Sequence, residues 1–144
     1  MESHFAIKVL LMSAACAMVF SSLIGVGMLF IIKGISEQGA PPKINLRQIG
    51  AAHLDWIMLA LMLGLAAAFI HFFELATVPL FAIAALVFGA WVNPLSYVFR
   101  AFGVNAFVFA GGPMQRISAA LGGLSSTGII IAWVMLIIPA VRAF

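Results

Sequence analysis

Hydrophobic residues along this chain fall into four long stretches, which cover residues 6–32, 49–73, 76–99 and 117–141. Each stretch is close to the length of about 20 residues that an α-helix needs to cross a bilayer. Three connections join the stretches, and no internal repeat or second domain separates them. The pattern predicts a single membrane domain, an all-α integral membrane four-helix bundle with both termini on the same side.

Proline and glycine mark the expected interruptions. The polar residues 34–48 contain glycine and two adjacent prolines, so they are predicted to form a loop. Pro79 falls in the first turn of its helix, where proline is tolerated, but Pro94 lies inside the third span and is expected to kink it. That kink frees the carbonyl of Ala90, as is typical where backbone lines a cavity. Residues 101–115 are glycine-rich yet apolar, which favours a connection that lies at the membrane interface or dips into it.

Composition strengthens the membrane assignment. The chain is 65% hydrophobic and 8% charged, whereas soluble proteins are about half apolar and about a quarter charged. The net charge of +3 comes from basic residues that are scattered and form no basic run, so nucleic acid is not expected as a partner. The expected partner is the lipid bilayer. The single Cys16 excludes an intrachain disulfide.

The basic residues predict an orientation. The end of the bundle with the first and third connections carries Lys33, Lys43, Arg47, Arg100 and Arg116, whereas the opposite end carries Lys8 and Arg142. Because cytoplasmic loops are enriched in Lys and Arg, the two connections are predicted to be cytoplasmic. This places the protein in a bacterial inner membrane with periplasmic termini.

Polar side chains inside the spans are functional candidates, because they are costly in hydrocarbon. His53 lies near the start of the second span, and Asn93 and Tyr97 lie near the end of the third. Since the helices alternate in direction, these three residues fall at the same end of the bundle. Gly89, Asn93 and Tyr97 follow one another at four-residue spacing and share one helix face, with Arg100 near it. We therefore expect His53, Asn93 and Tyr97 to converge on one cavity that faces the cytoplasm.

Two interpretations of His53 remain open on the sequence alone. It is either an interfacial residue bonded to a carbonyl, or an axial ligand of haem iron, since one neutral imidazole in an apolar shell is a common haem arrangement. A lone histidine cannot hold a bare zinc ion. A haem macrocycle supplies its own four nitrogens, so haem is the metal group that this chain could hold.

The neighbouring polar and aromatic residues have structural alternatives. Asp55 lies about 200° around the helix from His53, so it is expected to face another helix or to pair with Arg47 or Lys43. Arg100 either extends to the lipid headgroups or contacts a haem propionate. Trp91 points away from the stripe that holds Asn93.

At the opposite end of the bundle, His71 and Glu74 are expected to anchor the chain at the interface. The fourth span carries two stripes of small residues at four-residue spacing: Ser118, Gly122 and Ser126, and in parallel Ala119, Gly123 and Thr127. Such stripes allow close helix approach. Packing within the bundle and a seam between copies both remain open.

Several function classes lack support. The chain has no nucleotide-binding fingerprint, no hydrolase nucleophile motif and no zinc-protease motif. It also lacks an acidic residue in the middle of the first span, which the small four-helix multidrug transporters carry. Drug–proton exchange is therefore not expected.

Short motifs resemble one group of membrane enzymes. Ala52-His53 at the start of the second span, followed by Trp91-x-Asn93-x-x-x-Tyr97, resembles the styrene oxide isomerases, which are small four-helix membrane enzymes. The stretch from Ala52 to Asp55 is also similar to the A-H-L-E of the related hydroxylaminobenzene mutases, whose third span carries an aromatic-x-Asn. As a hydropathy pattern the resemblance covers about residues 7–140.

The resemblance implies a cofactor and a reaction. Styrene oxide isomerases are trimers that hold haem b at the subunit interface through the histidine that matches His53. Their ferric iron acts as a Lewis acid on the epoxide oxygen, and a 1,2-shift yields the aldehyde without consuming an electron. The tyrosine that matches Tyr97 lies in the substrate pocket. Asn93 is then a further substrate contact, and Trp91 and Arg100 are further haem contacts.

Two departures keep other functions open. The isomerases carry an asparagine six residues beyond the histidine, where this chain has Leu59, and an acidic residue two before the tryptophan, where it has Gly89. The leading hypothesis is a haem-b isomerase that acts on a small apolar epoxide or, alternatively, an N-aryl hydroxylamine. The others are a non-catalytic haem-binding or structural membrane protein and a small transporter.

Overall fold

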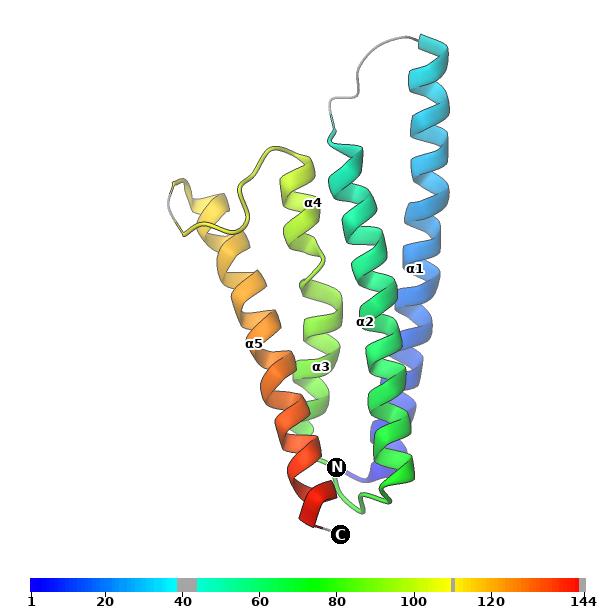
Figure 1. Ribbon diagram of the computed structural model, residues 1–144, viewed down its shortest axis with the longest axis vertical. Helices are drawn as coiled ribbons and strands as arrows, with labels where there is room; N and C mark the ends of the chain where they lie inside the picture. The colour runs from blue at the N-terminus through cyan, green and yellow to red at the C-terminus, as the bar shows by residue number, and fades with distance from the viewer. Residues whose placement is uncertain (39–43, 110, 143–144) are drawn as a thin grey trace.

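The computed structural model describes residues 1–38, 44–109 and 111–142. Its elements in order are α1 (Ser3–Gln38), α2 (Leu46–Phe72), α3 (Leu80–Val92), α4 (Leu95–Ala101) and α5 (Pro113–Arg142). Because α3 and α4 together form one span, the described chain has four helical spans that are long and apolar enough to cross a bilayer (Figure 1). The predicted all-α four-helix membrane fold is confirmed. The start of α1 and the end of α5 lie at the same end of the bundle (Figure 1).

The first two spans follow the predicted pattern with shifted ends. α1 continues to Gln38, so the first residues of the predicted loop 34–48 are helical instead. Of that loop, residues 39–43 lie outside the described part of the chain. Asn45 caps the start of α2, where its side chain accepts a hydrogen bond from the backbone N–H of Gln48 at 3.4 Å. An asparagine cap satisfies one of the free amides at a helix start.

The predicted start of the third span at residue 76 is wrong, because α3 begins at Leu80. The preceding residues pair with the N-terminus instead of joining the helix. The Val78 amide donates to the Met1 carbonyl at 3.0 Å, and the Met1 amino group donates to the Val78 carbonyl at 3.1 Å. Pro79 is then the N-cap residue of α3, because proline has no backbone N–H that could donate to a preceding helical turn.

The predicted kink at Pro94 is confirmed as a break between α3 and α4. The Asn93 amide still bonds to the Gly89 carbonyl at 3.0 Å, but Pro94 has no amide to continue the ladder. α4 ends in a Schellman motif, in which Gly103 has a φ of 82° and the Val104 amide bonds to the Phe99 carbonyl at 3.0 Å. This turn directs the following connection back over α4.

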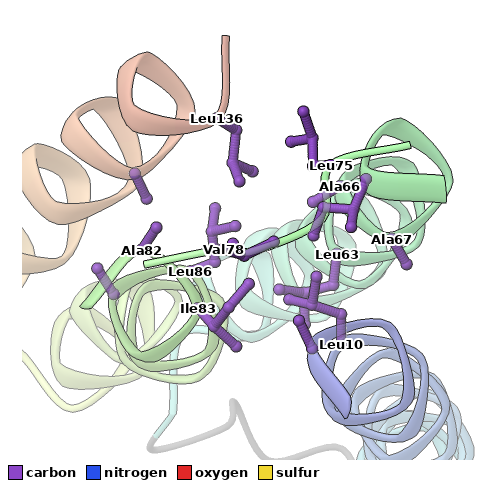
Figure 2. Packing of buried hydrophobic residues seen from close by; sticks show 14 of the residues in the cluster. Leu10, Leu63, Ala66, Ala67, Leu75, Val78, Ala82, Ile83, Leu86 and Leu136 are labelled. Atoms are coloured by element: carbon purple, nitrogen blue, oxygen red, sulfur yellow. The ribbon is translucent and has the colours of Figure 1, made fainter. Parts of the chain in front are cut away.

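The core lies between all four spans. Leu10, Leu63, Leu86 and Leu136 come from α1, α2, α3 and α5, and each is fully buried. Figure 2 shows these leucines pointing toward one another, with buried alanines between them. α2 lies between α1 and the α3–α4 span, and α5 packs on the other side of that span (Figure 1). The two middle spans, α2 and α3–α4, therefore each have a neighbouring span on either side.

α3 and α5 approach closely at Gly89. A Cβ atom placed there would lie 3.2 Å from the Ser125 carbonyl oxygen and would overlap the Ile129 side chain. One turn away, a Cβ at Gly128 would lie 3.6 Å from the Cβ of Ala85. The acidic side chain that the isomerases carry at this position therefore has no space in this packing.

The small residues of the two α5 stripes differ in burial, so packing within the bundle accounts for only some of them. Ser118 and Ala119 are buried inside the bundle. Gly123, Ser126 and Thr127 are exposed on the helix surface, although Ser126 still bonds to Asn93. The start of the predicted stripes thus packs within the chain, and later residues of both stripes lie on the helix surface.

A substitution at Gly89 tests the close approach. Gly89→Ala is expected to lower the free energy of unfolding by about 1–3 kcal/mol, because the new methyl group meets backbone that cannot rotate away. Thermal unfolding in detergent measures this change. Gly64→Ala is the matched control, since a Cβ there meets no atom within 4 Å. Equal melting temperatures for the two variants would contradict the prediction.

Candidate functional site

His53 is held against α1 by Ser21. The Nδ1 atom of His53 lies 2.8 Å from the Ser21 carbonyl oxygen and 2.7 Å from its Oγ. In return, the Ser21 hydroxyl donates to the His53 carbonyl oxygen at 2.8 Å. Ser21 is fully buried, and His53 is partly exposed. A serine on α1 therefore binds both the backbone and the ring of His53.

These contacts determine the tautomer of the ring. A carbonyl oxygen can only accept a hydrogen bond, so Nδ1 must carry the hydrogen that points at Ser21. The single hydroxyl hydrogen of Ser21 is already directed to the His53 carbonyl, which agrees with its Oγ also accepting from Nδ1. The Nε2 atom of the neutral ring therefore keeps a lone pair, and no described residue hydrogen-bonds it.

Gly25 makes room for the imidazole on α1. A Cβ atom at Gly25 would lie 3.1 Å from Cε1 and 3.4 Å from Nε2 of His53. The ring edge that bears the free lone pair therefore passes directly over a position without a side chain. Ser21 and Gly25 are one helical turn apart, so one face of α1 supplies both the anchor and the space.

An aromatic cluster adjoins His53 on the same flank of the bundle. Phe20 packs edge-on against Trp56, with ring centres 4.9 Å apart, and also contacts Trp91 at 5.6 Å. The Trp91 Nε1 donates to Ser13 Oγ at 3.0 Å. Trp91 therefore faces α1 and points away from the Asn93 stripe.

Asn93 lies at the α3–α4 break and joins three spans. Its Nδ2 donates to Asp55 Oδ2 on α2 at 3.1 Å. Its Oδ1 accepts from Ser126 on α5 at 2.9 Å and lies 3.1 Å from Ser125 Oγ. Of the two alternatives for Asp55, the structure has the one in which it faces another helix: its carboxylate meets Asn93 at the α3–α4 break and does not pair with Arg47. Lys43 lies outside the described residues.

A pocket of about 400 Å³ opens beside this network. Tyr97, Phe107 and Phe109 give it aromatic walls, and Asn93, Ser96 and Ser126 give it polar groups. The remaining lining is small: Ala106, Ala119, Gly122 and Gly123. The predicted apolar connection 101–115 therefore forms part of the pocket wall.

Arg100 contacts this connection. Its guanidinium lies 4.9 Å from the centre of the Phe107 ring, and the Tyr97 and Phe107 rings pack edge to face at 6.0 Å. A cation over an aromatic face is stabilising. Arg100 thus helps to hold the pocket wall in place.

The structure brings only part of the predicted site together. Asn93 and Tyr97 line the same pocket, but His53 is not among its lining residues. His53 faces α1, whereas Asp55, two residues later on α2, faces Asn93. The predicted convergence of His53, Asn93 and Tyr97 is therefore not found within a single chain.

The interfacial anchors at the other end lie near each other. His71 and Glu74 line a shallow surface pocket with His4 of α1. Glu74 has a φ of 49°, an unusual backbone conformation for a residue with a side chain, and it directs the chain out of α2. Among the residues that the structure describes, no group of three or more His, Cys, Asp or Glu could hold a metal ion.

Sequence reasoning missed the serines that complete both sites. Ser21 in α1 gave no signal, because a serine in a membrane helix usually bonds its own preceding turn. Ser126 was identified only as a small residue of a stripe and Ser125 was not singled out, because their bonds to Asn93 depend on how α5 packs. No family model, no curated protein and no solved structure matches this chain.

Proposed function

We propose that this chain is a haem-b membrane isomerase in which His53 Nε2 would hold the haem iron, and that it opens a small apolar epoxide to an aldehyde. The observation that carries the proposal is the hydrogen bonding of His53: Nδ1–H is fixed on the Ser21 carbonyl, and no described residue hydrogen-bonds Nε2. Metal-binding histidines typically have this arrangement, since the outer hydrogen bond sets the tautomer and orients the ring.

The donor set fits haem better than a bare metal ion. One protein nitrogen suffices when the macrocycle itself supplies four nitrogens to the iron. His53 is partly exposed at the α1–α2 surface, and Phe20 and Trp91 add aromatic surface to that flank.

Bound ferric haem would supply a Lewis acid, which stabilises the negative charge that develops on an opening epoxide oxygen. The residues of the chain would do the rest. Tyr97 and Phe107 give the pocket an aromatic lining that excludes water. Asn93, fixed by Asp55, orients the polar side of that pocket.

The two halves of this site lie in different parts of the bundle: His53 on α2 faces α1, whereas the pocket is lined by the α3–α4 span, the third connection and α5. Within one copy, the pocket of Tyr97 and Asn93 does not face the His53 ring. The proposed reaction therefore needs the His53 flank of one copy beside the pocket of another, as in the trimer that the resemblance implies. The basic end that carries Arg47, Arg100 and Arg116 is proposed to be cytoplasmic, in a bacterial inner membrane with periplasmic termini.

A non-catalytic haem-binding membrane protein is the second candidate. The separation of His53 from the pocket within one chain favours it, because haem binding then requires no second copy. A mutase-like rearrangement of an aryl hydroxylamine would use the same residues as the isomerase.

Two measurements on the detergent-purified protein separate these candidates. A Soret band together with conversion of styrene oxide to phenylacetaldehyde, without added reductant, supports the isomerase. A Soret band with no turnover across a panel of epoxides and aryl hydroxylamines supports the haem-binding protein. Absence of a Soret band after haem reconstitution overturns both.

Gly25→Ala is expected to weaken haem binding about tenfold, because the new methyl group pushes the His53 ring off its Ser21 contact and outer-shell changes of this kind cost 10- to 100-fold. Haem titration into the haem-free protein measures the affinity. Gly27→Ala, where a Cβ meets nothing within 4 Å, should titrate as the unchanged protein does. Identical curves for both variants would show that the ring does not depend on Gly25.

A further inference from the structure

The pocket behind the third connection has a composition that restricts its ligand. None of the described residues that line it carries a formal charge, and three of them are aromatic. A volume of about 400 Å³ is at the lower end of the range of about 300–1,000 Å³ for small-molecule sites. The pocket is therefore suited to a neutral molecule with one aromatic ring.

The hydrogen atoms of the pocket serines are already in use. The Ser126 hydroxyl donates to Asn93 Oδ1 at 2.9 Å, and the Ser96 hydroxyl donates to the Asn93 carbonyl oxygen at 2.9 Å. A hydroxyl has one hydrogen and two lone pairs. Both serines therefore present lone pairs to the pocket, and these can only accept a hydrogen bond.

Asn93 cannot reverse this pattern. Its Nδ2 is directed at Asp55, so its Oδ1 must face the serines of α5. A carboxylate accepts only, which excludes the flipped amide. Tyr97 has a hydroxyl that no described residue hydrogen-bonds, and it can donate or accept. The hydrogen bonds around Asn93 thus determine which kind of polar group of a ligand can bond to the serines.

We infer that this pocket binds a small neutral aromatic molecule whose polar group donates a hydrogen bond, as a phenol or a benzylic alcohol does, and that Ser126 accepts that bond. An ether or epoxide oxygen has no hydrogen to give and leaves the serine lone pairs unused. Of the two substrates named in the proposed function, the N-aryl hydroxylamine carries such donors, so the inference favours it over the epoxide. Binding at this pocket does not depend on haem.

The test compares two probes of similar size, 4-fluorophenol and 4-fluoroanisole, which differ in the donor hydrogen. Fluorine NMR titration of the full chain in detergent, corrected with empty micelles, gives both affinities. We expect the phenol to bind about three- to tenfold more tightly than the anisole, the ratio that one net hydrogen bond produces. Equal affinities, or tighter binding of the anisole, overturn the inference.

Three variants locate the bound probe. Ser126→Ala should remove the preference for the phenol, whereas Thr127→Ala, an exposed hydroxyl next to it and outside the pocket lining, should keep it. Gly123→Leu should weaken both probes, because its side chain enters the pocket from a position where a Cβ meets no atom within 4 Å. A preference that survives Ser126→Ala, or affinities unchanged by Gly123→Leu, overturn the inference.

The haem proposal can fail separately. The probe titrations are run on the haem-free protein, because no described residue that lines the pocket is one of the proposed haem contacts. Selective phenol binding by a protein without a Soret band would overturn only the haem proposal. A Soret band without selective binding would overturn only this inference.

Discussion

His53→Ala abolishes the Soret band of the reconstituted protein and lowers epoxide turnover at least about 1,000-fold, if His53 is the iron ligand. A Lewis acid at the reacting oxygen is worth several kcal/mol of transition-state stabilisation, which corresponds to a loss of this size. The measurements are absorbance spectra after haem reconstitution and aldehyde formation from styrene oxide.

The variant is expected to fold, because the bond from the Ser21 hydroxyl goes to the backbone carbonyl of residue 53 and survives the substitution. His71→Ala is the matched control, since His71 is exposed at the opposite end of α2. Imidazole added to the His53→Ala protein should restore part of the Soret band by occupying the vacated position. An undiminished Soret band in His53→Ala would remove the ligand assignment.

Asn93→Ala lowers the free energy of unfolding by about 2–4 kcal/mol, the second large effect that we expect. The substitution leaves the partly buried Asp55 carboxylate without its partner and also removes the acceptor of the exposed Ser126 hydroxyl. Each polar group left unsatisfied costs about 1–3 kcal/mol, more when it is charged. Chemical or thermal unfolding in detergent measures the change.

A double-mutant cycle with Asp55→Ala separates the network from a simple loss of packing. The two changes should be non-additive by about 0.5–3 kcal/mol, as for residues that share a hydrogen bond. Asn105→Ala is the control, because that exposed asparagine bonds only to the Phe107 amide, at 3.4 Å. If Asn93→Ala is as stable as Asn105→Ala, the three-span network does not stabilise the fold.

The hydrophobic pattern was sufficient to predict the four spans and the break at Pro94, since both depend on local sequence. The start of α3 could not be predicted, because residues 76–79 are held by a distant partner, Met1. Apolar residues next to a span are predicted as part of its helix, because the sequence gives no sign of the contact with Met1 that keeps them out of it.

The candidate site was predictable residue by residue but not as an arrangement. Helical phase correctly separated His53 from Asp55 on α2 and grouped Asn93 with Tyr97. Which helix each face of α2 meets depends on the order in which the spans pack, and sequence does not reveal that order. The same limit explains Gly89, which reads as a missing acidic residue and in fact marks the close approach of α3 to α5.

The unequal lengths of the spans set how the protein sits in a lipid of given thickness. At about 1.5 Å per residue, the 36 residues of α1 reach about 54 Å, whereas the 22 residues of the α3–α4 span reach about 33 Å. The short span matches a hydrocarbon layer of about 30 Å, and α1 must tilt or extend into water. Tyr97 and the pocket at the end of the short span then lie where acyl chains give way to headgroups. Weakly polar aromatic molecules accumulate at that depth, so the bilayer itself would concentrate ligands beside the opening.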